Sequence, residues 1–158
     1  MIRIVRGAQE LPGQNLFQYV DEEGTRRAIG STDVNAYLRE VAGEYTAKHF
    51  RTWGGTQLAA VLLRGENLPE AKTQAAKRLN AIVDEVAQSL GNTRAVCRKS
   101  YIHPRVIAHW SEGRLVEGMT AARASFTDPL DGLNEEETLL LRWLERSAKE
   151  VVKAAQAK

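Results

Sequence analysis

The sequence contains few of the residues that usually indicate secretion, membrane insertion or metal binding. Its 158 residues include one cysteine, Cys97, so no disulfide can form within the chain, which is typical of a reducing compartment. No apolar run is long enough to span a membrane, and residues 1–13 lack the apolar core of a signal peptide. The three histidines are not spaced as metal ligands. We therefore expect a cytoplasmic protein without metal or cofactor.

Acidic residues are also absent from one part of the chain. Acids and bases nearly balance overall, with 20 Asp and Glu against 22 Lys and Arg, yet residues 90–111 contain no acid. Arg94, Arg98 and Lys99 lie in this window, and such a concentration of positive charge favours a phosphate ligand. The tyrosine of the same window, Tyr101, could attack phosphorus and form a covalent intermediate, although most charge runs are solvated surfaces.

Composition and periodicity predict a mainly helical domain. The apolar content of 43% and charged content of 27% are ordinary for a soluble protein, and the length suits one domain with a core. Two short runs of aromatic and branched residues within residues 16–29 flank a turn and predict a small β-hairpin. Apolar spacing of three and four residues predicts the helices. Their expected first residues or caps are Ser31, Thr46, Pro69, Thr93, Pro104 and Asn134.

Two of these helices have apolar residues that recur at helical spacing. The expected face after Thr46 consists of Phe50, Trp53, Leu58, Val61 and Leu62. Gly54 and Gly55 are costly in this helix and suit a place where another backbone or a DNA strand comes close. Leu140, Trp143, Leu144, Val151, Val152 and Ala155 define a long, amphipathic final helix, which would pack against the chain or a partner.

Three segments together resemble one family. The segment LGNT, a basic spacer and SYIHP, at residues 90–104, resembles the active-site tyrosine segment of the bacterial and poxvirus-like type IB DNA topoisomerases. TAKHFRTWGGT, at residues 46–56, resembles the helix with an active-site arginine in that family. LPGQNLFQYVDEEG…STDVNAYLRE, at residues 11–40, resembles the part that precedes this helix. The resemblance covers roughly residues 2–113, in the right order.

The resemblance implies both a fold and a reaction. The fold is mainly α, of the type IB topoisomerase and tyrosine recombinase type, with at most a small hairpin. Tyr101 would attack a phosphodiester of duplex DNA, expel a 5′-hydroxyl and remain on the 3′-phosphate, without ATP or metal. Arg51, in KHFRTW, and Asn92, where many members carry histidine, would stabilise charge on the phosphorane. The residues expected to contact DNA phosphates are Lys48, Arg94, Arg98 and Lys99.

The sequence departs from the family at its beginning. Members carry another active-site arginine, and a general-acid lysine on a β-hairpin, upstream of the LPGQ-like segment. Only ten residues precede Leu11 here, and they include no lysine. We therefore expect a truncated catalytic domain at residues 1–112, a linker at residues 113–133 and an amphipathic helix at residues 134–158. Relaxation of DNA by this chain alone is expected to be weak, unless a second chain supplies the missing residues.

Two other interpretations stay open. A tyrosine recombinase would share the fold and the nucleophile, but it usually carries histidine where this chain has Lys48. A non-catalytic helical module that binds DNA or a partner would show salt-sensitive duplex binding and no covalent adduct. A protein that acts on DNA in this way would be found in the cytoplasm with the nucleoid. The oligomeric state does not follow from the sequence.

Overall fold

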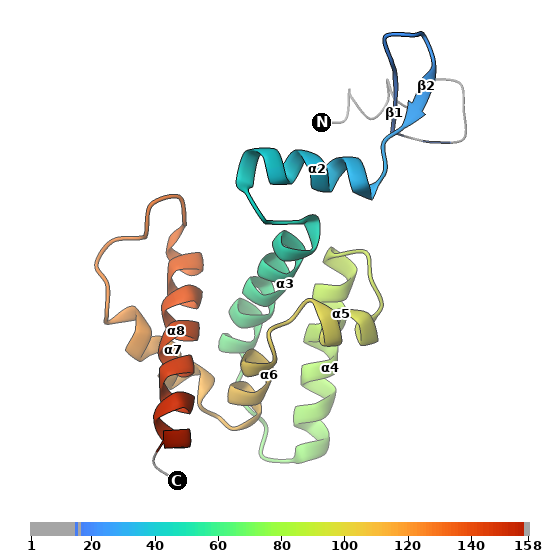
Figure 1. The fold of residues 1–158 in the computed structure, drawn as a ribbon. Helices are drawn as coiled ribbons and strands as arrows, with labels where there is room; N and C mark the ends of the chain where they lie inside the picture. The colour runs from blue at the N-terminus through green and yellow to red at the C-terminus, as the bar shows by residue number, and fades with distance from the viewer. Residues whose placement is uncertain (1–14, 16, 157–158) are drawn as a thin grey trace. The chain divides into compact units, whose positions relative to one another are not determined.

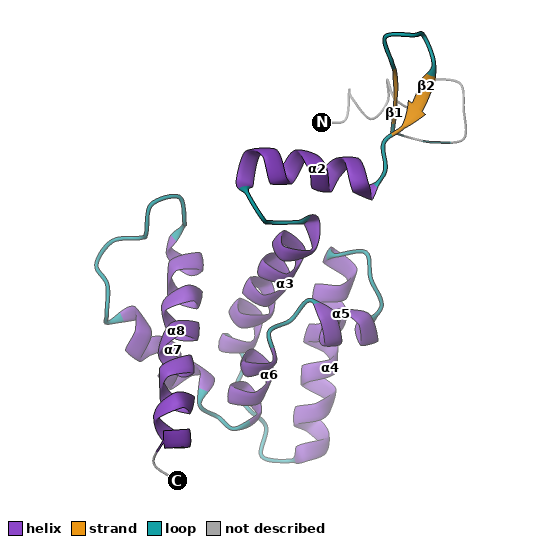
Figure 2. Cartoon of the chain, viewed as in Figure 1, coloured by secondary structure: helices purple, strands orange, loops and turns teal. Residues whose placement is uncertain are grey.

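The computed structural model of the chain describes residues 15 and 17–156, apart from the side chains of Val151 and Ala154. The LPGQ-like residues 11–14 therefore lie outside the described part. The chain divides into two units, residues 1–50 and residues 51–158. The described residues are mainly helical with one two-stranded hairpin (Figures 1 and 2), which confirms the predicted fold class. None of the described helices is long and apolar enough to cross a membrane.

A small hairpin opens the described part of the first unit, as predicted. Its strands are β1 (Gln18–Val20) and β2 (Arg26–Ala28), and they pair antiparallel. Asp21 closes the turn, because its carboxylate accepts the backbone N–H of Thr25 at 2.7 Å and pairs with Arg27 at 2.9 Å. The hydrogen bond from Arg27 lowers the pKa of Asp21. Local polar contacts of this kind close the turn without any buried side chain.

The helix α2 (Ser31–Ala42) follows the hairpin. The sequence suggested Ser31 as the N-cap, but Ser31 is the first residue of the helix. Gly30 is the N-cap, and its N–H donates to the Asp33 carboxylate at 2.8 Å. The helix ends at Gly43, whose φ of 77° is the left-handed conformation that glycine adopts easily. No residue of α2 is buried, so its apolar residues are exposed or half-buried.

The second unit consists of helices. The helix α3 (Ala47–Arg64) begins in the first unit and continues into the second. The later helices are α4 (Lys72–Ser89), α5 (Arg94–Ser100), α6 (Pro104–Ser111), α7 (Leu115–Arg123) and α8 (Glu135–Gln156). The predicted caps of α5 and α8 are confirmed: Thr93 accepts the N–H of Val96 at 3.4 Å, and Asn134 and Glu137 cap each other at 2.9 and 3.0 Å. Pro69 does not open α4, which begins three residues later.

The apolar face predicted for α3 contributes only part of the contact between this helix and the core of the second unit. Val61 is 38% exposed, whereas Trp53, Leu58 and Leu62 are only partly buried. Phe50, which belongs to the first unit, is 52% exposed. The buried residues of α3 are Gly55, Thr56, Ala59, Ala60 and Leu63. Four of these five are small, so neighbouring backbone can approach α3 closely, and hydrophobicity alone did not reveal this face.

Residues 113–133, predicted as a linker, contain α7. Leu115, Met119 and Ala122 of this helix are buried. Gly118 lies among them, although glycine is a poor helix former. A Cβ at Gly118 would lie 2.8 Å from the indole nitrogen of Trp143, so the glycine lets α7 approach α8. The structure thus includes this segment in the packed core.

The apolar face predicted for α8 is buried over only part of its length. Leu140 and Trp143 are each 1% exposed, and Leu144 packs against the core. Val152 is 54% exposed and Ala155 is also exposed. Burial along α8 is confined to the part that contacts its neighbours.

Candidate functional site

Tyr101 lies at the end of α5 in the second unit. It is the C-cap residue of this helix, and its backbone N–H donates to the carbonyl of Cys97 at 2.9 Å. Its side chain is half-buried and packs against the core, and its hydroxyl makes no hydrogen bond among the described residues. Tyr101 is therefore supported by packing, while its hydroxyl has no hydrogen-bond partner among the described residues.

Arg51, Asn92 and Tyr101 lie together although they come from three segments. The Arg51 guanidinium donates from Nη2 to the carbonyl of Leu90 at 2.6 Å, and the Asn92 amide donates to the same oxygen at 3.0 Å. The carbon atom Cζ of Arg51 lies 5.0 Å from the centre of the Tyr101 ring, in a cation–π contact. The structure thus brings together the three residues to which the sequence assigned a catalytic role.

The end of α4 supplies the oxygen that holds Arg51. The last carbonyls of a helix have no partner within the helix and carry partial negative charge, so they attract a guanidinium. Gly91 follows with φ of 63°, a left-handed conformation that turns the chain back. The backbone N–H of Asn92 then donates to the carbonyl of Ala87 at 2.8 Å. This turn places the Asn92 amide beside Arg51, and the sequence did not predict the role of Leu90.

Cys97 is the buried residue of α5. Its side chain is fully inaccessible, and burial raises the pKa of its thiol while the charge of Arg51 opposes the shift. A buried neutral thiol acts as a small apolar side chain. We therefore assign Cys97 to the core of the second unit and not to the reactive groups.

The residues predicted to contact phosphates differ in their surroundings. Arg94 forms an ion pair with Asp84, which raises the pKa of Arg94 and lowers that of Asp84 through their hydrogen bond. Arg98 and Lys99 are exposed and form no ion pair within the described part of the chain. Lys48 is exposed in the first turn of α3 and belongs to the first unit. The α5 helix next to Tyr101 thus carries two cations that are not neutralised by any described acid.

His103 and Arg105 have structural roles. The ring nitrogen Nδ1 of His103 accepts the backbone N–H of Arg105 at 3.2 Å and caps α6. Burial, and then the charge of Arg105, lower the pKa of His103. The Arg105 side chain donates to the hydroxyl of Ser147 on α8 at 3.1 Å. Within the described part of the chain, the hydrogen bonds of these two side chains go to the α6 cap and to α8, and none goes to Arg51, Asn92 or Tyr101.

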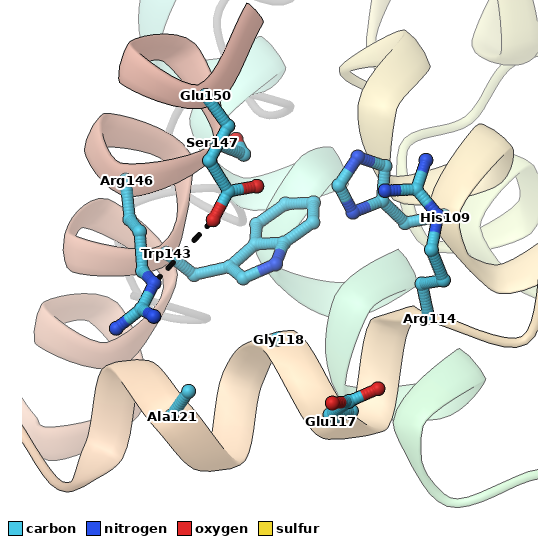
Figure 3. Close-up of a pocket in the computed structure, with 9 residues that line it drawn as sticks. All are labelled: His109, Arg114, Glu117, Gly118, Ala121, Trp143, Arg146, Ser147 and Glu150. Carbon is cyan, nitrogen blue, oxygen red and sulfur yellow. Dashed lines mark ion pairs between the residues drawn. The ribbon is translucent and has the colours of Figure 1, made fainter. Parts of the chain in front are cut away.

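A separate cavity of about 220 Å³ lies in the second unit (Figure 3). Residues of α6, α7 and α8 line it, and the indole of Trp143 meets the His109 ring edge-on, with ring centres 5.3 Å apart. Arg146 and Glu150 pair across its wall at 3.5 Å. Charges of both signs line this cavity, and none of the residues predicted for the site does. It gives no sign of a preference for phosphate.

Among the described residues, no group of three or more His, Cys, Asp or Glu side chains is placed to hold a metal ion.

Residues 1–120 match the family of eukaryotic DNA topoisomerase I, catalytic core. The match covers about three quarters of the 158 residues. The chain therefore belongs to the family of the eukaryotic DNA topoisomerase I catalytic core. A search of curated proteins finds no significant match. The mainly helical structure with a small hairpin agrees with this membership.

Proposed function

We propose that the chain is a type IB topoisomerase catalytic fragment of the bacterial and poxvirus-like kind. The observation that supports this most is the contact of Arg51 with Tyr101, together with the shared bond of Arg51 and Asn92 to one carbonyl. The family match supports the general class, and the segments KHFRTW and SYIHP support the subtype. Duplex DNA is the substrate of the reaction.

The proposed reaction is a transesterification. The Tyr101 hydroxyl attacks a phosphodiester, loses its proton and forms a bond to phosphorus. The bond from phosphorus to the 5′-oxygen breaks, and this oxygen takes up a proton. One phosphoester replaces another, so the 3′-phosphotyrosyl bond retains the energy that resealing needs, and neither ATP nor metal is consumed. Supercoils relax while the strand is open.

Arg51 and Asn92 would stabilise the charge that develops on phosphorus. The guanidinium has five N–H donors, and Leu90 is the only hydrogen-bond partner that Arg51 has among the described residues. The remaining donors can therefore bind a phosphate oxygen without a large movement of the side chain. Loss of one such donor typically costs about 10²–10³-fold in rate. Because Leu90 holds the guanidinium in place, little reorganisation accompanies the reaction.

The 158-residue chain alone is expected to relax DNA slowly. The general-acid lysine and the further arginine that the resemblance implies have no identified counterpart among its residues. Absence of general acid catalysis typically costs about 10²–10⁴-fold. A second chain that carries these residues would restore the rate. A substrate with sulfur at the bridging 5′ position avoids this requirement, because a thiol is far more acidic than an alcohol and leaves without protonation.

This substrate provides the test. Wild-type chain incubated with a 5′-phosphorothiolate duplex should form a covalent protein–DNA adduct, which a denaturing gel detects. Tyr101→Phe should form none, because it lacks the attacking oxygen, and should bind the uncleaved duplex as tightly as wild type. Arg51→Ala should form the adduct about 10²–10³-fold more slowly. Equal adduct formation by Tyr101→Phe would contradict the proposal.

A non-catalytic DNA-binding module is the second candidate. The side chains of Arg98 and Lys99 favour it, because they are exposed, form no ion pair with any described residue, and would attract a duplex whether or not cleavage follows. Salt-sensitive binding of the phosphorothiolate duplex by the wild-type chain, without any adduct, would establish this alternative.

A further inference from the structure

Threonines of α3 hold the backbone on both sides of Tyr101. The hydroxyl of Thr52 donates to the carbonyl of Ser100 at 3.3 Å. The hydroxyl of Thr56 accepts the backbone N–H of His103 at 3.0 Å and donates to the carbonyl of Thr52 at 2.7 Å. The bonds to Ser100 and His103 join α3 to the turn between α5 and α6, and Tyr101 lies between these two residues.

Gly55 lets α3 come close enough for these bonds. A Cβ at this position would lie 2.7 Å from the carbonyl oxygen of Tyr101 and 3.0 Å from Cδ1 of Leu90. The Thr56 hydroxyl itself lies 3.4 Å from the Tyr101 carbonyl. Because Thr56 is 2% exposed, water does not readily replace its hydroxyl as the partner of the His103 N–H. The bond from His103 therefore depends on residue 56.

We infer that Thr56 is a positioning residue for Tyr101 and sets the phenol against the Arg51 guanidinium. This inference rests on the proposed function of the cluster. The helix α3 carries Arg51 five residues before Thr56, so one rigid element holds both the nucleophile and the group that would stabilise the transition state. A displacement of about 1 Å in such an arrangement can cost about 10²-fold in rate. Thr56 acts through the backbone and does not touch DNA.

Two substitutions distinguish the effect of the Thr56 hydroxyl on cleavage from the effect of the packing of the Thr56 side chain. Thr56→Val keeps the shape and removes the acceptor of the His103 N–H. Thr56→Ser keeps the hydroxyl and removes a methyl group. The matched control is Thr120→Val on α7, because Thr120 is exposed and its hydroxyl donates to the carbonyl of Val116 in its own helix at 2.9 Å.

The experiment measures single-turnover cleavage of the 5′-phosphorothiolate duplex at saturating DNA, with the dissociation constant measured separately. Thr56→Val should slow adduct formation by about 10- to 100-fold, with DNA affinity unchanged. Thr56→Ser and Thr120→Val should cleave at close to the wild-type rate. Thr52→Val should slow cleavage by less than Thr56→Val, because the bond to Ser100 is longer than the bond to His103. If Thr56→Val does not fold, Thr52→Val replaces it as the test variant.

The results separate this inference from the proposed function. Wild-type rates in Thr56→Val, or an equal loss in Thr56→Ser, would overturn the positioning role while leaving the reaction intact. If the wild-type chain forms no adduct, the proposed function fails. NMR spectra then still test the placement, because Thr56→Val should shift the signals of the Tyr101 ring and the Arg51 guanidinium. Unchanged signals would overturn the inference that Thr56 positions Tyr101.

Discussion

The two units of the chain use their apolar side chains in opposite ways. No described residue of residues 15–50 is buried, and Tyr37 is 64% exposed. Residues 51–156 enclose a core in which Trp143 is 1% exposed. Isolated hairpins and short helices are marginally stable, and among the described residues side-chain burial stabilises the second unit. Arg51, Asn92 and Tyr101 all belong to this unit.

Removal of a core side chain of the second unit should have the largest effect on stability. Trp143→Ala leaves a cavity between α7 and α8 and removes the contact with His109. The free energy of unfolding should fall by about 3–5 kcal/mol, as measured by urea denaturation followed by circular dichroism. A loss below about 1 kcal/mol would mean that this region of the second unit is not packed as described.

Adjacent glycines of α3 should respond with opposite signs. Gly55→Ala places a Cβ against the backbone carbonyl of Tyr101 and should destabilise the protein by about 1–3 kcal/mol. Gly54→Ala meets no atom within 4 Å and should stabilise α3 by up to about 1 kcal/mol. Thermal denaturation of both variants measures the contrast. Equal effects would show that α3 does not approach the Tyr101 turn closely.

Caps and turns were predictable because their chemistry is local. The caps Thr93 and Asn134 each lie within three residues of the backbone N–H that they accept. The resemblance named Arg51, Asn92 and Tyr101, and the structure brings them together. Their catalytic roles stay predictions.

The remaining features depend on contacts between distant residues. Asp84 lies ten residues before Arg94, outside the acid-free window, so the sequence did not indicate their ion pair. The threonine bonds of α3 cross 47 residues between Thr56 and His103. Small residues such as Ala59 fill the core face of α3 without a strong apolar signal. Only the fold reveals which of these distant residues meet.

The stability of the second unit should depend weakly on pH through His103. Its pKa is lowered in the folded protein, so the unfolded chain binds the proton first as pH falls below about 6.5. The stabilisation is therefore present above pH 6.5 and is lost at lower pH. His103→Asn keeps a cap acceptor for α6 and should flatten this dependence in denaturation curves between pH 5 and 7. His109, whose pKa burial also lowers, should leave a residual slope.

Truncation of an exposed side chain in the first unit should have the smallest effect. Tyr37→Ala should change the free energy of unfolding by at most about 0.5 kcal/mol, because Tyr37 is 64% exposed. The same urea denaturation used for Trp143→Ala gives the comparison. A loss near that of Trp143→Ala would show that apolar residues of α2 are buried in solution, and would remove the contrast between the units.

The most direct measurement is the chemical identity of the residue that becomes attached to DNA. The wild-type chain is incubated with the 5′-phosphorothiolate duplex, digested with nuclease and trypsin, and analysed by mass spectrometry. The expected result is a residual nucleotide on the tryptic peptide of residues 100–105, attached to Tyr101 through a 3′-phosphate. A nucleotide on another residue, or an unmodified peptide from a chain that binds the duplex, would contradict the assignment of Tyr101 as the nucleophile.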